Sequence, residues 1–202
     1  MDAYEGPLEL SGEWDFGFAL DSHVDYSEYK GKNAYGFDTY KNTYTPIGEL
    51  LYQIKYRSAY EYIAALTDLV VKAIDYAPRV SEETKSADII LPVPPSNRNR
   101  PLQPVYEIAK NIGEALEIPV RFDILKKITS TKQVKSLSDK REKQQILRNA
   151  FQLCRAEELN GKRVLLFDDL FQTGATMSTL TKLIQQHADA MIVAMALTKT
   201  RR

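Results

Sequence analysis

The chain carries the stretch Val164-Leu165-Leu166-Phe167-Asp168-Asp169-Leu170-Phe171-Gln172-Thr173-Gly174-Ala175-Thr176. It starts with an apolar run, which predicts a strand buried on both faces, as in a parallel sheet. The run ends in two acids, and a helix-like segment begins after the turn, at about Met177. Open α/β sheets bind ligands at the carboxyl ends of such strands. We therefore expect a ligand site where this strand ends.

The residues of this stretch suit two chemical groups that lie side by side. Thr173 to Thr176 offer backbone N–H groups and hydroxyls at a helix N-terminus, which favours an anion, and Gly174 lets the backbone approach it closely. Asp168 and Asp169 accept hydrogen bonds from hydroxyls and bind hard cations. The combination indicates a ligand with a ribose diol next to a phosphate. An acidic turn before a Thr-capped helix, with no ligand, is the open alternative.

The same stretch resembles the PRPP-binding motif of the type I phosphoribosyltransferases, where PRPP is 5-phosphoribosyl-1-pyrophosphate. The resemblance implies that Asp168 and Asp169 bind the ribose hydroxyls and, through the diol, Mg²⁺. It also implies that the turn, with Gln172 at its start, binds the 5′-phosphate. The turn residues are Gln172, Thr173, Gly174, Ala175 and Thr176.

Other segments are similar to the ComF branch of this family. Leu91 to Arg100 reads as a strand that runs into a proline-rich, basic loop. By resemblance, Pro94, Pro95 and Ser96 contact PRPP, and Arg98 and Arg100 hold the pyrophosphate. Lys132 lies where the family has a mobile loop that closes over PRPP. The other similar segments are Ile47–Leu51, Lys55-Tyr56, Thr129–Gln133 and Arg148–Phe151.

Two departures from the ComF pattern are visible. ComF proteins typically begin with a four-cysteine zinc module, but this chain has a single cysteine, Cys154. Arg100-Pro101-Leu102-Gln103 also stands where ComF-like chains usually carry Arg-Gly-Phe-Asn-Gln. Pro101 removes a backbone donor and stiffens the loop, so the pyrophosphate grip is expected to differ.

Composition is that of an enzyme-sized chain of 202 residues, of which 44% are hydrophobic. The 27 basic and 27 acidic residues balance, which argues against a generally nucleic-acid-binding surface. One cysteine excludes an intramolecular disulfide and fits a reducing compartment. We see neither a signal peptide nor an apolar run of the ~20 residues that span a bilayer. A cytoplasmic protein without membrane contact is expected.

The pattern changes near residue 45. Residues 1–45 are rich in aromatics, and we expect a β- or loop-rich cap, with a half-buried strand at 13–18, that serves as the acceptor hood. Residues 46–202 are expected to form the phosphoribosyltransferase-like α/β domain, a mainly parallel sheet flanked by helices. The helices expected are 45–57, 59–76, 104–117, 139–148 and 175–187, and the further strands are 88–93, 119–124 and 190–197.

The functional prediction is a Mg²⁺-dependent phosphoribosyltransferase that uses PRPP and a nucleobase-like or amine acceptor. The alternative is a non-catalytic PRPP- or nucleotide-binding regulator, or a DNA-uptake partner protein of the ComF type. A homodimer is an open expectation because many relatives are dimers. His23 and Asp21 are candidates for metal or substrate contact, although packing within the cap is favoured. The tyrosines of the cap also leave base stacking open.

Overall fold

A five-stranded sheet forms the centre of the computed structural model, which describes residues 6–95, 102–129 and 149–200. The strand order is β1-β2-β9-β8-β5. β2, β9, β8 and β5 run parallel to their neighbours, and β1 pairs antiparallel with β2 at one edge. The strands of this sheet are β1 (Leu8–Glu9), β2 (Phe16–Ser22), β5 (Ile89–Pro92), β8 (Lys162–Phe171) and β9 (Ala190–Lys199).

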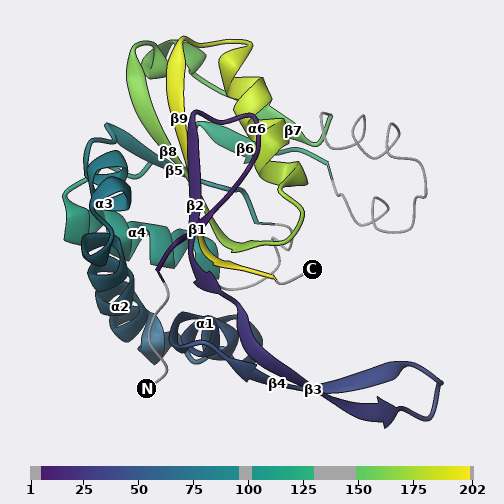
Figure 1. Cartoon of the computed structure of the whole chain (residues 1–202). Coiled ribbons are helices and arrows are strands. Elements are labelled where there is room, and N and C mark those ends of the chain that lie inside the picture. Colours follow the sequence, from purple (N-terminus) through teal and green to yellow (C-terminus); the bar gives the residue numbers. More distant parts are fainter. Residues whose placement is uncertain (1–5, 96–101, 130–148, 201–202) are drawn as a thin grey trace.

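Helices cover both faces of this sheet (Figure 1). α1, α2, α3 and α4 pack against one face, and α6 packs against the other. This arrangement confirms the expected α/β class, a mainly parallel sheet flanked by helices. The helical elements are α1 (Pro46–Arg57), the 3₁₀ turn η1 (Tyr60–Tyr62), α2 (Ile63–Tyr76), α3 (Pro78–Lys85), α4 (Pro104–Leu116), the 3₁₀ turn η3 (Ala156–Leu159) and α6 (Ala175–Gln185).

β8 is the strand that carries the acid pair. Its side chains alternate between the two faces, so Leu165 and Phe167 pack toward α1–α4, whereas Val164 and Leu166 pack toward α6. The strand does not stop at the acids. It continues to Phe171, because its last residues still pair with β9. The sequence-based expectation of a strand that ends at the acids is corrected accordingly.

The N-terminal segment contributes to the central sheet. β2 pairs in parallel with β9 along its length, and Phe18 is 1% exposed. Gly17, Ala19 and Leu20 are buried as well. Residues 8–22 therefore belong to the α/β core, and the boundary expected at residue 45 is corrected for them. The expected half-buried strand at 13–18 is also corrected, since β2 lies between two strands and is covered on both faces.

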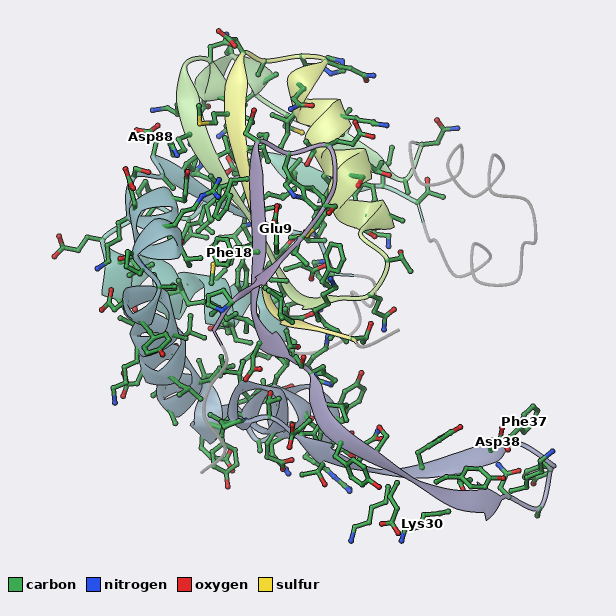
Figure 2. All side chains as sticks on the ribbon, viewed as in Figure 1. Glu9, Phe18, Lys30, Phe37, Asp38 and Asp88 are labelled. Carbon is green, nitrogen blue, oxygen red and sulfur yellow. The ribbon has the colours of Figure 1, made fainter. Side chains whose placement is uncertain are left out.

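A hairpin follows directly and leaves the body of the molecule. It consists of β3 (Val24–Lys32) and β4 (Asp38–Tyr44), which pair antiparallel with each other. Figure 1 shows it projecting beyond α1. In Figure 2, Phe37 and Asp38 mark its far end and Lys30 lies along it, away from the core residue Phe18. This hairpin is the part of the expected cap that lies outside the sheet.

The expected helices at 45–57, 104–117 and 175–187 and the expected strands at 88–93 and 190–197 agree with α1, α4, α6, β5 and β9, whereas the other described segments differ. α1 begins after Thr45, whose Oγ1 accepts a hydrogen bond from the Gly48 N–H at 3.1 Å. The segment expected as one helix from residue 59 is η1 followed by α2, and α3 was not expected. No strand spans 119–124, because only Val120 bridges to Ile90. Instead, β6 (Leu125–Lys127) pairs with β7 (Phe151–Leu153).

Two expectations about other segments have different outcomes. The helix expected at 139–148 lies outside the described residues. Among the helices that are described, none has the length and apolar character to cross a bilayer.

Candidate functional site

The acid pair lies at the edge of the sheet where the parallel strands have their carboxyl ends. β5 ends beside it, because the Val93 N–H donates to the Phe167 carbonyl at 2.8 Å. Pro94 and Pro95, which come directly after this bond on the β5 side, therefore lie close to Asp168, which comes directly after Phe167 on β8. The structure thus brings two of the predicted PRPP-binding segments to one edge of the sheet, as expected for open α/β folds.

The turn after β8 has a backbone shape that requires glycine. Gly174 has a φ of +71°, and a Cβ at this position would lie 2.7 Å from Cζ of Phe171. α6 starts at the next residue, and Thr173 Oγ1 accepts a hydrogen bond from the Ala175 N–H at 3.3 Å. Gln172, Thr173 and Ala175 are exposed. The turn therefore presents the N-terminus of a helix to solvent, an arrangement that suits an anion.

Trp14 packs against this turn, a position that no pattern in the sequence indicated. Its ring meets Phe171 edge-on, with 6.1 Å between the ring centroids, and its Nε1 donates to the Leu10 carbonyl at 2.7 Å. A Cβ on Gly12 or Gly17 would lie within 2.3 Å or 2.0 Å of the indole ring. These two glycines make room for the ring against the backbone, and the ring fills the space under the turn.

The two acids have different surroundings. Asp169 is buried, and its Oδ1 forms an ion pair with Nζ of Lys55 on α1 at 2.8 Å. Asp168 is half-buried, and its Oδ1 accepts a hydrogen bond from the Asp169 N–H at 2.9 Å. Acids at a strand end are expected to be exposed, and this expectation is corrected for both residues, since neither of them is exposed.

Burial and the neighbouring charges shift the pKa values of this group. Burial, followed by the charge of Asp169, raises the pKa of Asp168 to about 8. Burial disfavours the ammonium of Lys55, but the carboxylates of Asp169 and Asp168 outweigh that effect and raise the pKa of Lys55. Lys55 thus lies near both carboxyl groups, and its ion pair is with Asp169.

His23 lies beside this group, at the junction of β2 and β3. It is buried, and its Nδ1 lies 3.0 Å from Oγ1 of Thr198 on β9. Burial and the nearby Lys55 ammonium lower the pKa of His23, while Asp169 opposes the shift. The sequence favoured a packing role for His23 within a cap, and its ring does contact Tyr44, with 5.3 Å between the centroids. Its position next to the acid pair was not expected.

A groove opens beside the end of β5. It has a volume of about 350 Å³ and is lined by Pro94, Pro95, Gln103, Tyr106, Phe122, Leu125, Lys126, Lys127 and Ile128. A larger hollow, of about 570 Å³, lies at the opposite edge of the sheet, around the end of α6 and the start of β9. Only the groove is near the carboxyl ends of the strands.

Four predicted site residues lie outside the part of the chain that the structure describes. They are Ser96, Arg98, Arg100 and Lys132. Their assignment to PRPP and pyrophosphate stays a prediction from the resemblance. Within the described residues, no group of three or more His, Cys, Asp or Glu side chains is placed to hold a metal ion.

Comparison with known proteins supports the resemblance. The chain is 28% identical over 145 residues to competence protein F of Haemophilus influenzae, a match that covers 70% of this chain and 62% of that protein. The chain thus spans less than two thirds of this relative's length. The match confirms the predicted similarity to ComF proteins.

The chain was also compared with solved structures and with family models. Among solved structures, adenine phosphoribosyltransferase from Leishmania donovani is 16% identical, with a TM-score of 0.47, over 96% of this chain and 74% of that chain. No family model matches the chain.

Proposed function

We propose that this chain binds PRPP at the carboxyl edge of its sheet and, with Mg²⁺, transfers the phosphoribosyl group to a nucleobase-like or amine acceptor. The observation that carries the proposal is the placement of Asp168 and Asp169 directly before the Gly174 turn and the N-terminus of α6. Acceptors for a diol and donors for a phosphate lie on consecutive residues of one strand–turn–helix unit. The 5′-phosphate binds the turn, and the ribose hydroxyls bind the acids.

The reaction exchanges one bond at the anomeric carbon of PRPP. The bond from C1 to the pyrophosphate oxygen breaks, and the bonding electrons leave with the pyrophosphate. The acceptor nitrogen bonds to C1 and loses its proton. Because positive charge develops on the ribose and negative charge on the leaving group, catalysis requires cations around the pyrophosphate and a site with little water.

The acid pair suits a Mg²⁺ ion that the substrate holds for the most part and the protein holds with only one or two carboxylates. Mg²⁺ usually binds one or two carboxylates, and phosphate oxygens and water complete its coordination. Asp168 and Asp169 would supply those carboxylates. When bound, the ion would neutralise charge on the pyrophosphate.

The alternative is a PRPP-binding regulator of the ComF type that does not turn over its ligand. Pro101, in place of the usual glycine of the first loop, supports this alternative, because the loop loses a backbone donor for pyrophosphate. A DNA-uptake partner protein is another form of this alternative. Binding alone does not separate these functions, whereas pyrophosphate release does.

The decisive experiment titrates the full chain with PRPP and Mg²⁺ by calorimetry and by the fluorescence of Trp14, the single tryptophan, which lies under the turn. Wild type is expected to bind, and the double variant Asp168→Asn with Asp169→Asn is expected to lose binding. Asp189→Asn is the matched control, because this exposed acid lies at the opposite edge of the sheet. A wild type that does not bind PRPP contradicts the proposal.

Turnover is then measured as pyrophosphate release against a panel of nucleobases and amines. Release with one acceptor class supports the transferase and identifies its substrate. Binding without release for every acceptor supports the regulator instead.

A further inference from the structure

Lys55 is the residue that pairs directly with the acid pair, and it comes from a distant part of the chain. It lies in the last turn of α1, 114 residues before Asp169 in the sequence. The two side chains are only 18% and 11% exposed, and Nζ lies 2.8 Å from Oδ1. Water and salt compete weakly for a pair this well buried, so its geometry is fixed more firmly than that of a surface ion pair.

α1 presents this lysine from a firmly docked position. At the start of the helix, the N-cap residue Thr45 donates a hydrogen bond from its Oγ1 to the Ser22 carbonyl at 2.7 Å. This bond connects the start of α1 to the end of β2. A Cβ on Gly48 would lie 2.1 Å from the His23 carbonyl oxygen, so the helix backbone packs directly on the β2–β3 junction. Ile47, Leu51 and Ile54 are buried in the core on the same face. The ammonium group is therefore held by a rigid element.

The two acids lie on opposite faces of β8, and this explains why Lys55 pairs with Asp169 and not with Asp168. Side chains alternate along β8, so Asp169 shares the face of Phe167, on which α1 packs, and Asp168 shares the face of α6. Two adjacent carboxyl groups in a buried site disfavour each other's charge. A cation fixed on one of them stabilises the pair and restricts the rotation of the carboxylate that it holds.

We propose that Lys55 is a positioning residue of the ribose-diol site, which holds Asp169 in one orientation beside Asp168 so that the hydroxyls of the ligand meet two fixed acceptors. This inference rests on the proposed binding of PRPP. Removal of the ammonium leaves a buried carboxylate without its partner, and such a group reorients or becomes neutral. Either change removes an oriented acceptor from the diol site.

The test measures the affinity of the full chain for PRPP with Mg²⁺ in Lys55→Met, Lys55→Gln and Lys55→Arg. We expect affinity to fall by about tenfold or more in Lys55→Met, since each tenfold step corresponds to about 1.4 kcal/mol, and Lys55→Arg to recover most of it. A glutamine at position 55 is more readily accommodated beside a carboxylate than a methionine. Lys55→Gln therefore replaces Lys55→Met in the affinity measurement if the methionine variant does not fold. The matched control is Lys182→Met, which breaks an exposed 2.8 Å ion pair with Glu13 and should leave affinity unchanged.

A double-mutant cycle with Asp169→Asn separates positioning from direct contact with the ligand. If Lys55 acts through Asp169, Lys55→Met has little further effect in the Asp169→Asn background. If the two losses add in full, Lys55 contacts the anionic ligand itself and the inference is overturned. Equal affinity of Lys55→Met and wild type also overturns it, while the proposed function stands. A wild type that does not bind PRPP overturns both.

Discussion

Residues 8–22 and residues 24–44 are both rich in aromatic side chains, but they have opposite positions in the molecule. The first segment forms β1, β2 and the Trp14 support of the Gly174 turn, and its strand β2 is largely buried. The second forms the projecting β3–β4 hairpin, where Tyr35 is 85% and Phe37 is 70% exposed. The difference shows that aromatic content alone does not distinguish a core strand from an exposed arm. What separates them is the availability of a neighbouring strand, since β2 pairs with β9 and the hairpin pairs only with itself.

The largest difference between the two segments is expected when each of them is removed in turn. Removal of residues 1–22 takes β1 and β2 out of the sheet and exposes β9 as an edge, so the chain should not fold. Replacement of residues 25–43 by an Asn-Gly turn between Val24 and Tyr44, which face each other in the ladder, should leave the fold intact. Circular dichroism and thermal unfolding of the two proteins measure this difference. If both shortened proteins fold equally well, the conclusion that residues 8–22 are core and residues 24–44 are an exposed arm is wrong.

Within the buried half, Trp14→Ala is expected to lower the free energy of unfolding by about 3–5 kcal/mol, the usual cost of emptying a large aromatic site. The indole also fills the space beneath Phe171, so affinity for PRPP should fall as the turn loosens. Urea unfolding and calorimetric titration provide the two readouts. The control is Phe37→Ala in the hairpin, and a similar loss in that variant would contradict the comparison.

A smaller loss is expected at the contact between α1 and the junction of the two halves. The methyl group of Gly48→Ala would press on the His23 carbonyl, so α1 must shift at a cost of about 1–3 kcal/mol. Because Lys55 is carried by the same helix, affinity for PRPP should also decline. Gly36→Ala at the hairpin tip is a partial control, since its Cβ meets no neighbour, although its φ of +79° adds local strain. Unfolding curves that show no loss for Gly48→Ala would mean that this contact is not tight.

The junction should also show a pH dependence. The pKa of His23 is lowered in the folded protein, by burial first, so the unfolded chain binds a proton that the folded chain excludes. Asp168, whose pKa is raised, acts in the opposite sense over this range, so the expectation concerns the contribution of His23: its share of the free energy of unfolding slopes downward as the pH drops below about 6.5, the ordinary value for histidine. His23→Asn should reduce this slope relative to wild type, and His187→Asn, at an exposed site, serves as the control. Unfolding measured between pH 7.5 and pH 5 gives the result.

The smallest effect is expected at the far end of the hairpin. Tyr35→Ser and Phe37→Ser remove exposed rings and should change the free energy of unfolding by less than about 0.5 kcal/mol. Affinity for PRPP should also stay the same. A loss above 1 kcal/mol would show that the hairpin tip packs more extensively than its exposure indicates.

Local patterns were sufficient for the elements whose periodicity is simple. The apolar runs of β8 and β9, the Thr45-Pro46 start of α1 and the proline-bounded α4 were all predicted close to their observed positions. The strand predicted at 119–124 is not formed, because this segment pairs with β5 only through the bridge between Val120 and Ile90, although its composition suits a strand. β2 was misassigned because the polar–aromatic alternation at 13–18, which overlaps its start, resembles a half-buried strand, whereas its buried position depends on pairing with β9, which is distant in sequence.

The candidate site divides in the same way. Asp168, Asp169 and the Gly174 turn were found from the sequence, since their chemistry lies on consecutive residues of one strand–turn–helix unit. Lys55, His23 and Trp14 were not assigned to it. Each comes from an element more than a hundred residues before the acid pair, and none has a local signal that points there.

The sequence by itself thus determined the α/β class and the candidate strand–turn–helix site, because both follow from short-range periodicity and from neighbouring residue types. Only the tertiary structure decided which half of the aromatic N-terminal segment is core, that Asp169 is paired before any ligand binds, and that the turn rests on Trp14. Those outcomes depend on which strands meet and on which face of β8 a side chain points to. Long-range pairing sets both, and no local pattern encodes it.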